Sequence, residues 1–407
     1  MVSNKEMPKI VSESDTQTAN MKILHVGPLM LSHASGLPES ILGFASAQID
    51  MGLKVGLLSP LPLIQSKSMK QIPSVCLLGS PHRTHYNPWI IPRDWIRHIR
   101  NKFGTPDLVN FHSTYIPFNI ALARRCRQVS WRYVITAHGV MGCLAQNTKR
   151  IKKRIANLLF FRSYVKHAEA IHAFSASEAK EIQKLFKVKK IIIVPNGVED
   201  YFLEASEKLS PADLGDFGSK GDLMLGFIGR IDVYHKGLDL LLNALKLLKS
   251  QMERPICNLF VIGPFHTKKD ERSFCRMVES LGLKDNVKLL GAKYGKEKLR
   301  YFLACDIFVH TSRFEGMPMS VLEAMALGRT CLVTAATNVS DIVCEGGGWA
   351  CKPDSISIAE TIKSIYEQRD SLKALGRQSH ELIQTRFTWT NVAQKLYQEH
   401  SKLCCIG

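Results

Sequence analysis

The sequence lacks the short signatures of several common nucleotide and metal sites. It contains no G-x-G-x-x-G dinucleotide fingerprint and no G-x-x-x-x-G-K-[ST] phosphate loop. Its 11 cysteines form no C-x-x-C pair or other metal-ligand spacing, and no pair of carboxylates has the D-x-D arrangement. These absences disfavour a nicotinamide dehydrogenase and a P-loop site. We therefore expect neither a cofactor nor an obligatory metal.

Long apolar runs are missing as well. No stretch of 18 apolar residues exists, so no transmembrane helix is expected. The first 20 residues are polar and have no apolar segment, which predicts a flexible tail rather than a secretion signal. An odd number of cysteines without such a signal indicates reduced thiols. We therefore expect a cytoplasmic protein.

Acidic residues are scarce in one half of the chain. Residues 1–198 hold 27 lysines and arginines against 10 aspartates and glutamates, whereas residues 199–407 hold 27 against 26. Residues 108–168 contain 11 basic residues and no acidic one. The net charge of +18 therefore belongs almost entirely to the first half. A strongly basic half suits an anionic partner, such as a membrane surface, an acidic glycan or a nucleic acid.

Apolar runs of strand length alternate with helical patterns over most of the chain. Near-continuous apolar strands with intervening helices predict an α/β protein in which parallel sheets are covered on both faces. A polar stretch with glycine and serine, residues 199–222, interrupts the alternation, which then restarts. We therefore predict a tail (1–20), a first doubly wound domain (21–198), a linker (199–222), a second doubly wound domain (223–385) and a C-terminal helix (386–407) that crosses back to the first domain.

Two cations follow the first predicted strand of the second domain. In GFIGRIDVYHKG the strand ends at Gly229, Arg230 follows, and Lys236 opens a helix. Free N–H groups at a helix start favour anions. An arginine fork together with a lysine point charge suits a diphosphate. The alternative is a surface arginine and lysine near an ordinary turn.

Two glutamates, Glu315 and Glu323, stand in FEGMPMSVLEAMALG (314–328). Pro318 suits the start of a helix, apolar residues then recur at helical spacing, and Gly328 suits the residue beyond its end. A helix throughout would separate the two acids by about 12 Å, which is long for a hydrolase pair at about 5–9.5 Å. They could contact two parts of one extended ligand, or they could be a solvated acid and a capping acid.

Two further loops lie at strand ends in the first domain, where ligands of such sheets bind. Gly36 precedes a helix that opens near Pro38, so its backbone could approach a phosphate. His138 follows the strand of YVITAHG and could donate to a ligand or stabilise developing charge. An ordinary loop and a structural histidine are the alternatives. The turn PNGV (195–198) has an architectural pattern.

Taken in order, these motifs resemble the retaining GT-B glycosyltransferases of family 4. GR followed by KG, then EGMPMSVLEAMALG, carries the resemblance, and TAHG, VPNGV, CDIFVHTS and RFTWTNVAQKLYQEH occur in the expected places. The resemblance covers about residues 21–402. It implies two Rossmann-like domains facing a central cleft, with the acceptor bound by the first and a nucleotide sugar by the second.

The resemblance also implies roles for individual residues. Arg230 and Lys236 would hold the diphosphate, and Glu323 the ribose hydroxyls. The remaining positions, in the phosphate loop and around the donor sugar, would be Gly36, His138, Gly229, Glu315, Gly316 and Met317. Two departures stand out. The phosphate loop often has two adjacent glycines but reads Ser35-Gly36, and TNVSDIV replaces a Gly-Gly-x-x-Glu pattern, with Asp341 nearest the usual glutamate.

The expected function is metal-independent transfer of a hexose-type sugar, with retention, to a lipid-linked or polysaccharide acceptor of a cell-surface glycan. The basic, partly apolar stretch 147–168 predicts contact with an anionic membrane surface on the cytoplasmic side. A catalytically inactive nucleotide-sugar-binding relative is one alternative. A basic nucleic-acid-binding protein is another, although the neutral second half and the lack of a known module disfavour it.

Overall fold

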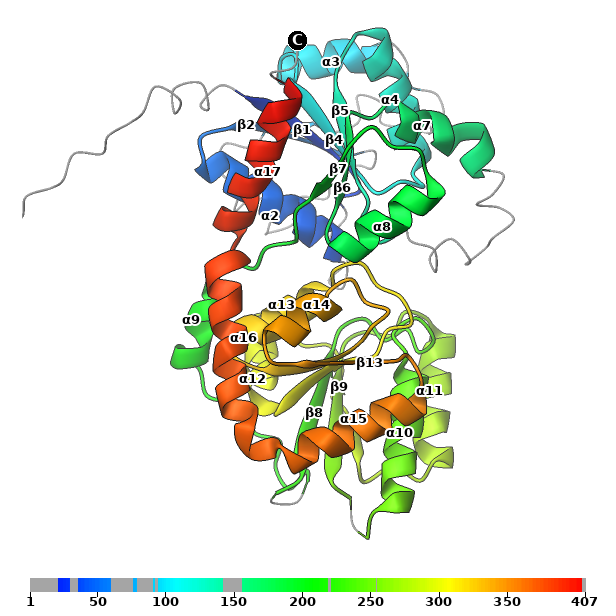
Figure 1. Ribbon diagram of the computed structural model, residues 1–407, viewed down its shortest axis with the longest axis vertical. Helices are drawn as coiled ribbons and strands as arrows, with labels where there is room; N and C mark the ends of the chain where they lie inside the picture. Colours follow the sequence, from blue (N-terminus) through cyan, green and yellow to red (C-terminus); the bar gives the residue numbers. More distant parts are fainter. Residues whose placement is uncertain are drawn as a thin grey trace, which may run out of the picture.

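The computed structural model describes residues 21–29, 36–59, 76–78, 91, 94–141, 156–218, 221–253 and 255–404. These residues form two parallel sheets, each with helices on both faces, stacked along the long axis of the molecule (Figure 1). Each buried strand reads as a short apolar run because helices cover both of its faces. The predicted α/β class with two doubly wound units is confirmed.

The first sheet has seven strands in the order β3-β2-β1-β4-β5-β6-β7. Its strands are β1 (Lys22–Val26), β2 (Lys54–Leu58), β3 (Cys76–Leu78), β4 (Leu108–His112), β5 (Tyr133–Thr136), β6 (Ala170–Ala173) and β7 (Ile191–Ile193). Its helical segments are α2 (Gly36–Asp50), α3 (Asp94–Lys102), α4 (Pro117–Gln128), the π-helical turn η2 (Asn157–Phe161), α7 (Arg162–Lys166) and α8 (Ala176–Leu185).

The second sheet has six strands in the order β10-β9-β8-β11-β12-β13. Its strands are β8 (Leu223–Ile228), β9 (Cys257–Ile262), β10 (Val287–Leu289), β11 (Ile307–His310), β12 (Thr330–Thr334) and β13 (Trp349–Cys351). The helices around it are α10 (Leu238–Gln251), α11 (Lys268–Ser280), α12 (Gly295–Ala304), α13 (Met319–Ala326), α14 (Ser340–Glu345), α15 (Ser355–Glu367), the 3₁₀ turn η3 (Arg369–Ser371) and α16 (Leu372–Arg386).

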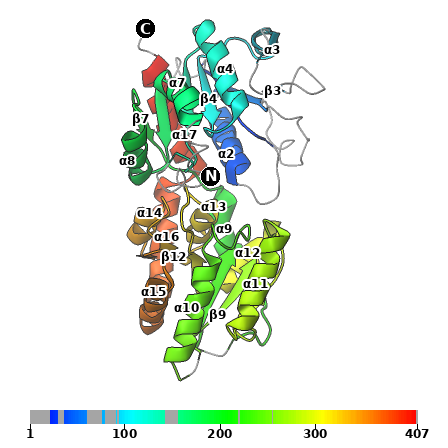
Figure 2. The ribbon, with the colours of Figure 1, turned by 90° about the vertical axis from the view of Figure 1, so that its right-hand side faces the viewer.

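Two segments pass between the sheets. Within the stretch predicted as a linker, α9 (Asp200–Lys208) forms and packs against α12 and α13. The last helix, α17 (Trp389–Cys404), returns to the first sheet and lies along α2 (Figure 2). Trp389 anchors this return, because its ring packs edge-on against Phe44 with centroids 4.9 Å apart. The predicted domain limits themselves stay a prediction.

Some local expectations differ from the structure. Lys236 was expected to open a helix, but α10 begins at Leu238 and Lys236 lies in the preceding turn. The short edge strands β3 and β13 were not anticipated from the sequence. The basic residues of segment 149–154 lie outside the described residues. None of the described helices has the length and apolar character needed to span a membrane.

Candidate active site

The two sheets bring their carboxyl ends together, and the predicted site residues lie there. His138 follows β5 in the first sheet, while Glu315 follows β11 in the second. The turns touch directly: a Cβ atom added to Gly139 would lie 2.5 Å from the Cα of Gly316. Gly139 also has a φ of +76°, which favours glycine. The structure therefore brings the His138 turn against the Glu315–Met317 loop.

Glu315 is surrounded by cations and histidines. Its Oε2 accepts a hydrogen bond from the Nζ of Lys236 and lies 3.7 Å from the Nε2 of His310 and 3.8 Å from the Nε2 of His235. Burial alone would raise the pKa of this carboxyl, but Lys236 and the two histidines outweigh burial and hold the pKa well below its usual range. Glu315 is therefore an anion, and Lys236 is its counterion.

The turn that carries Lys236 requires glycine at its end. Gly237 has a φ of +63°, and a Cβ atom there would lie 2.0 Å from the carbonyl oxygen of Thr311. The close approach holds the start of α10 against the loop after β11. Only glycine fits both constraints, which explains why a glycine follows Lys236 in this turn. Lys236 thus reaches Glu315 from a neighbouring strand end.

Arg230 lies at the same edge of the sheet, two residues beyond the end of β8 and after Gly229. Its Nε is buried and has no hydrogen-bond partner among the described residues. The structure therefore places the two predicted diphosphate ligands differently. Lys236 is paired with a carboxylate, whereas the Arg230 guanidinium has a buried donor with nothing to bind. A buried unpaired donor costs about 1–3 kcal/mol, so a ligand anion there would be favourable.

Glu323 lies on α13 and is 5% exposed. Its Oε2 accepts a hydrogen bond of 2.6 Å from the Nζ of Lys298 on α12. No hydrogen bond or ion pair joins Glu323 to Glu315 in the described chain. Each of the two glutamates has its own lysine. The sequence did not reveal Lys298, because α12 meets α13 only in the folded chain.

The starts of two helices face each other beside this site. Gly36 opens α2, and a Cβ atom on it would lie 3.7 Å from the Cγ of Met319, the first residue of α13. The first N–H groups of a helix lack partners within the helix and carry partial positive charge. The structure therefore brings Gly36 to the loop that holds Gly316 and Met317.

Met317 is fixed by a residue that sequence reasoning treated as architectural. Asn196 donates from its backbone N–H to the Met317 Sδ at 3.2 Å and from its Nδ2 to the Met317 carbonyl oxygen at 3.3 Å. Ser40 on α2 donates to the Asn196 Oδ1 at 2.6 Å. Asn196 therefore links α2 to the loop after β11. The only sequence signal was its place in a tight turn, PNGV.

His138 is held in an unusual backbone conformation with a φ of +51°. Its Nε2 lies 2.9 Å from the Nδ1 of His112, and the N–H of the next residue, Gly139, donates to the Glu178 Oε1 at 2.7 Å. Burial raises the pKa of Glu178 to about 7, although the N–H groups of Phe174 and Gly139 oppose that shift. His112 and Glu178 were missed, although a Ser-x-x-Glu capping pattern at 175–178 was visible.

The described residues contain no group of three or more histidine, cysteine or carboxylate side chains arranged to hold a metal ion. The charged groups in this region include Lys236, Lys298 and Arg230 with Glu315 and Glu323. This arrangement suits an extended ligand with anionic and hydroxyl groups. The sugar and phosphate roles of individual residues stay predictions.

Two family models cover most of the chain. Residues 34–201 match the model described as Glycosyltransferase Family 4, and residues 215–382 match the model described as Glycosyl transferases group 1. The first match contains Gly36 and His138. The second contains Arg230, Lys236, Glu315 and Glu323.

Curated relatives align over part of their length. The mannosylfructose-phosphate synthase of Agrobacterium fabrum is 27% identical over 216 residues, which cover 52% of this chain and 47% of that protein. One component of the human phosphatidylinositol N-acetylglucosaminyltransferase is 24% identical over 234 residues, covering 57% of this chain and 45% of that protein. The aligned region thus spans about half the length of these relatives.

Solved structures agree over nearly the whole chain. The HepE protein of Anabaena, in complex with UDP and glucose, has a TM-score of 0.72 at 18% identity, covering 94% of this chain and 100% of that one. A glycosyltransferase of Rickettsia africae has a TM-score of 0.74 at 15% identity, covering 95% and 100%. At such identity a structure shows the fold alone. With both family models and the fold in agreement, this chain belongs to the GT-B glycosyltransferases.

Proposed function

We propose that this protein is a retaining glycosyltransferase that moves a hexose-type sugar from a nucleoside-diphosphate sugar to a lipid-linked or polysaccharide acceptor. The observation that carries the proposal is the contact between the His138 turn and the Glu315–Met317 loop, with Lys236 paired to Glu315. This contact joins the ion-paired carboxyl end of the second sheet to the histidine-rich carboxyl end of the first. HepE, with UDP and glucose in its structure, offers a precedent for such a donor.

In this proposal the developing charge is on the departing nucleoside diphosphate. Lys236, Arg230 and the starts of α2 and α13 would stabilise it, so the interaction strengthens as the sugar–phosphate bond breaks. The acceptor oxygen forms the new bond to the same face of the sugar carbon. A phosphate oxygen of the leaving group takes the acceptor proton. No metal is needed, because protein cations supply the positive charge.

The two glutamates would divide the rest of the donor between them. Glu323, with Lys298 beside it, would accept hydrogen bonds from the ribose hydroxyls. Glu315, with the backbone N–H groups of Gly316 and Met317, would face the sugar. A carboxylate can accept hydrogen bonds from two hydroxyl groups at once, which suits vicinal hydroxyl groups. The separate lysine partners of the two acids support separate roles.

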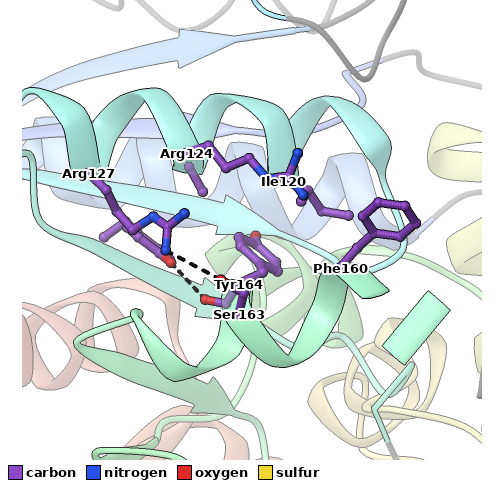
Figure 3. A pocket seen from close by; sticks show the side chains of 8 residues that line it. Ile120, Arg124, Arg127, Phe160, Ser163 and Tyr164 are labelled. Carbon is purple, nitrogen blue, oxygen red and sulfur yellow. Dashed lines mark hydrogen bonds between the residues drawn. The ribbon is translucent and has the colours of Figure 1, made fainter. Parts of the chain in front are cut away.

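The basic surface of the first sheet supports an acceptor presented at an anionic membrane surface. Arg124 and Arg127 on α4 and Ser163 on α7 line one small cavity, with Phe160 beside Arg124 (Figure 3). Arg127 donates to the Ser163 Oγ at 3.4 Å, and its side chain is exposed. Among the described residues of the stretch 147–168, Val165 is buried. The exposed cations would then contact lipid head groups reversibly on the cytoplasmic face.

A panel of nucleoside-diphosphate sugars tests the proposal. Release of free nucleoside diphosphate is measured with wild-type protein and with Arg230→Ala, and exposed Arg377→Ala is the matched control. We expect one donor class to be turned over by the wild type and Arg377→Ala, and turnover by Arg230→Ala to fall about 100-fold. Wild-type turnover by Arg230→Ala would contradict the diphosphate role, and turnover of no donor would favour a binding protein.

A further inference from the structure

Three histidines, two of them fully buried, form one hydrogen-bonded chain that ends at His138. The Gln48 Oε1 lies 2.8 Å from the His25 Nε2, and the His25 Nδ1 lies 2.8 Å from the His112 Nε2. The His112 Nδ1 then lies 2.9 Å from the His138 Nε2. The chain runs from α2 through β1 and β4 to the turn after β5. Gln48, His25 and His112 are fully buried, whereas His138 is half-buried at the site.

The direction of every hydrogen bond in this chain follows from its inner end. An amide oxygen only accepts, so His25 carries its proton on Nε2 and its Nδ1 is a bare acceptor. His112 must then donate from Nε2, which leaves its own Nδ1 bare. His138 in turn must donate from Nε2. A neutral imidazole has one N–H, so the Nδ1 of His138 has a free lone pair.

The three imidazole rings of this hydrogen-bonded chain are neutral, and its inner end has no group that could release or take up a proton. Burial lowers the pKa of His25 to about 4 and the pKa of His138 to about 3, and it also lowers the pKa of His112. Gln48 at the inner end is an amide, which neither takes nor releases a proton at ordinary pH. A chain of this kind therefore fixes orientation and does not transport protons. No other described residue hydrogen-bonds the His138 Nδ1.

We infer that Gln48, His25 and His112 are positioning residues that lock His138 as the Nε2-protonated tautomer, so that its Nδ1 accepts a hydrogen bond from a ligand hydroxyl. The inference rests on the proposed role of His138 at the site. It assigns that residue to hydroxyl recognition and not to donation toward the leaving diphosphate. Specificity for a correctly placed hydroxyl follows, because a missing hydroxyl would leave a half-buried acceptor without a partner.

A matched pair of variants separates this role from simple structural support. His112→Asn places an amide oxygen where the ring Nδ1 was, so His138 keeps its acceptor. His112→Phe fills the space without an acceptor. A third variant, His172→Phe, removes a buried histidine from the adjacent strand β6 that bonds Thr136 and Val194 and lies outside the chain. It reports what the loss of a buried imidazole does to folding alone.

The primary measurement is the tautomer of His138, read by long-range proton–nitrogen NMR on histidine-labelled full-length protein and assigned with His138→Gln. We expect the Nε2-protonated form in the wild type, in His112→Asn and in His172→Phe. His112→Phe should show a mixture or the other tautomer. An Nδ1-protonated His138 in the wild type would overturn the inference, because a 180° turn of the Gln48 amide reverses every donor. An unchanged tautomer in His112→Phe would also overturn it.

Turnover of a donor identified by the panel provides the second readout. His112→Phe should lower kcat about 10- to 100-fold with little change in the KM for the donor, and His112→Asn should restore most of that loss. A loss of thermal stability equal to that of His172→Phe, with no change in kcat, would mean a structural role and contradict the inference. The NMR result does not depend on turnover. Failure of the glycosyltransferase proposal would therefore be distinguished from failure of the tautomer lock.

Discussion

The two sheets meet at one edge with different chemistry. The first sheet ends in buried neutral histidines, His25, His112 and His172, whose pKa values burial lowers. The second ends in ion pairs, Lys236 with Glu315 and Lys298 with Glu323. A buried charge requires a partner, so the second sheet pairs its buried charges, whereas the buried histidines of the first sheet stay neutral.

This difference indicates which part of a ligand each edge can bind. Lysines already neutralised by carboxylates can exchange or share those partners with a phosphate, whereas neutral imidazoles cannot balance an anion. Neutral nitrogen acceptors suit hydroxyl groups. The comparison therefore supports the proposals that the second sheet holds the diphosphate and that His138 of the first sheet contacts a sugar hydroxyl.

Away from the shared carboxyl ends, it is the first half of the chain that carries the larger net charge. The first 198 residues carry 27 basic and 10 acidic residues, but the remaining residues carry 27 and 26. Among the described residues, most of the ion pairs lie in the second half, and they include Lys284 with Glu279 and Arg386 with Glu345. The outer surface of the first half is therefore the charged surface that lacks internal compensation.

The largest expected effect comes from removing charge from the second edge. Lys236→Ala should lower kcat/KM for the donor about 10²–10³-fold, because a preorganised cation aimed at the leaving group is lost. Turnover with the donor identified by the panel measures it. Lys296→Ala, an exposed lysine of α12, is the control and should behave as the wild type. Equal activity of Lys236→Ala and Lys296→Ala would contradict the proposal that the second sheet binds the diphosphate through charge.

The next effect separates the two glutamates within the second edge. Glu323→Gln should weaken binding of the free nucleoside diphosphate about 10-fold, because an anionic acceptor of hydroxyl hydrogen bonds becomes a neutral one. Glu315→Gln should leave that binding nearly intact and impair transfer. Calorimetric titration measures binding, with exposed Glu360→Gln as the control. Equal losses of binding in both variants would contradict the division of roles.

A smaller effect concerns the outer surface of the first half. Arg124→Gln should reduce binding to anionic vesicles about 5-fold at low salt, since one cation contributes about 1 kcal/mol near such a surface and salt screens it. Co-sedimentation with anionic and neutral vesicles across a salt series measures it. Binding that ignores lipid charge would argue for a soluble acidic glycan or for no anionic partner at all.

The smallest effect is on stability, and it depends on pH. In the folded wild type the pKa of Glu315 is lowered. Its ionised carboxylate therefore adds to the free energy of unfolding above pH 4.5, the pKa in the unfolded chain, and this stabilisation is lost as the pH falls toward the lowered pKa. In Lys236→Ala burial dominates and the ionised acid becomes unfavourable. The free energy of unfolding of the variant should be about 1 kcal/mol lower than that of the wild type near pH 7.5, and the difference should be smaller near pH 5. Chemical unfolding at both pH values measures it, and a loss independent of pH would mean a different cause.

Sequence reasoning predicted the parts of the molecule that depend on local pattern. Alternating apolar strands and helices gave the two parallel sheets, and strand ends located His138, Arg230 and Glu315, because ligand edges coincide with carboxyl ends. The helical spacing after Pro318 placed Glu323 on a buried helix, as the structure has it.

The partners of those residues could not be read in the same way. Lys298 meets Glu323 across two helices, and Asn196 joins α2 to Met317 from 121 residues away. The hydrogen-bonded chain of His25, His112 and His138 joins the neighbouring strands β1 and β4 and the turn after β5, and its members are 87 and 26 residues apart in sequence. Such contacts depend on tertiary packing, and a single sequence has no local signal for them.

Binding of nucleoside diphosphates by isothermal titration tests the central claim most directly, because it needs no acceptor. UDP, GDP and ADP are titrated into wild-type protein, Lys236→Ala and the control Lys296→Ala. We expect saturable binding of at least one nucleotide to the wild type and to Lys296→Ala, weakened about 10-fold or more in Lys236→Ala. Binding of none of the three to the wild type, or equal binding to Lys236→Ala, would contradict the assignment of the diphosphate to the second sheet.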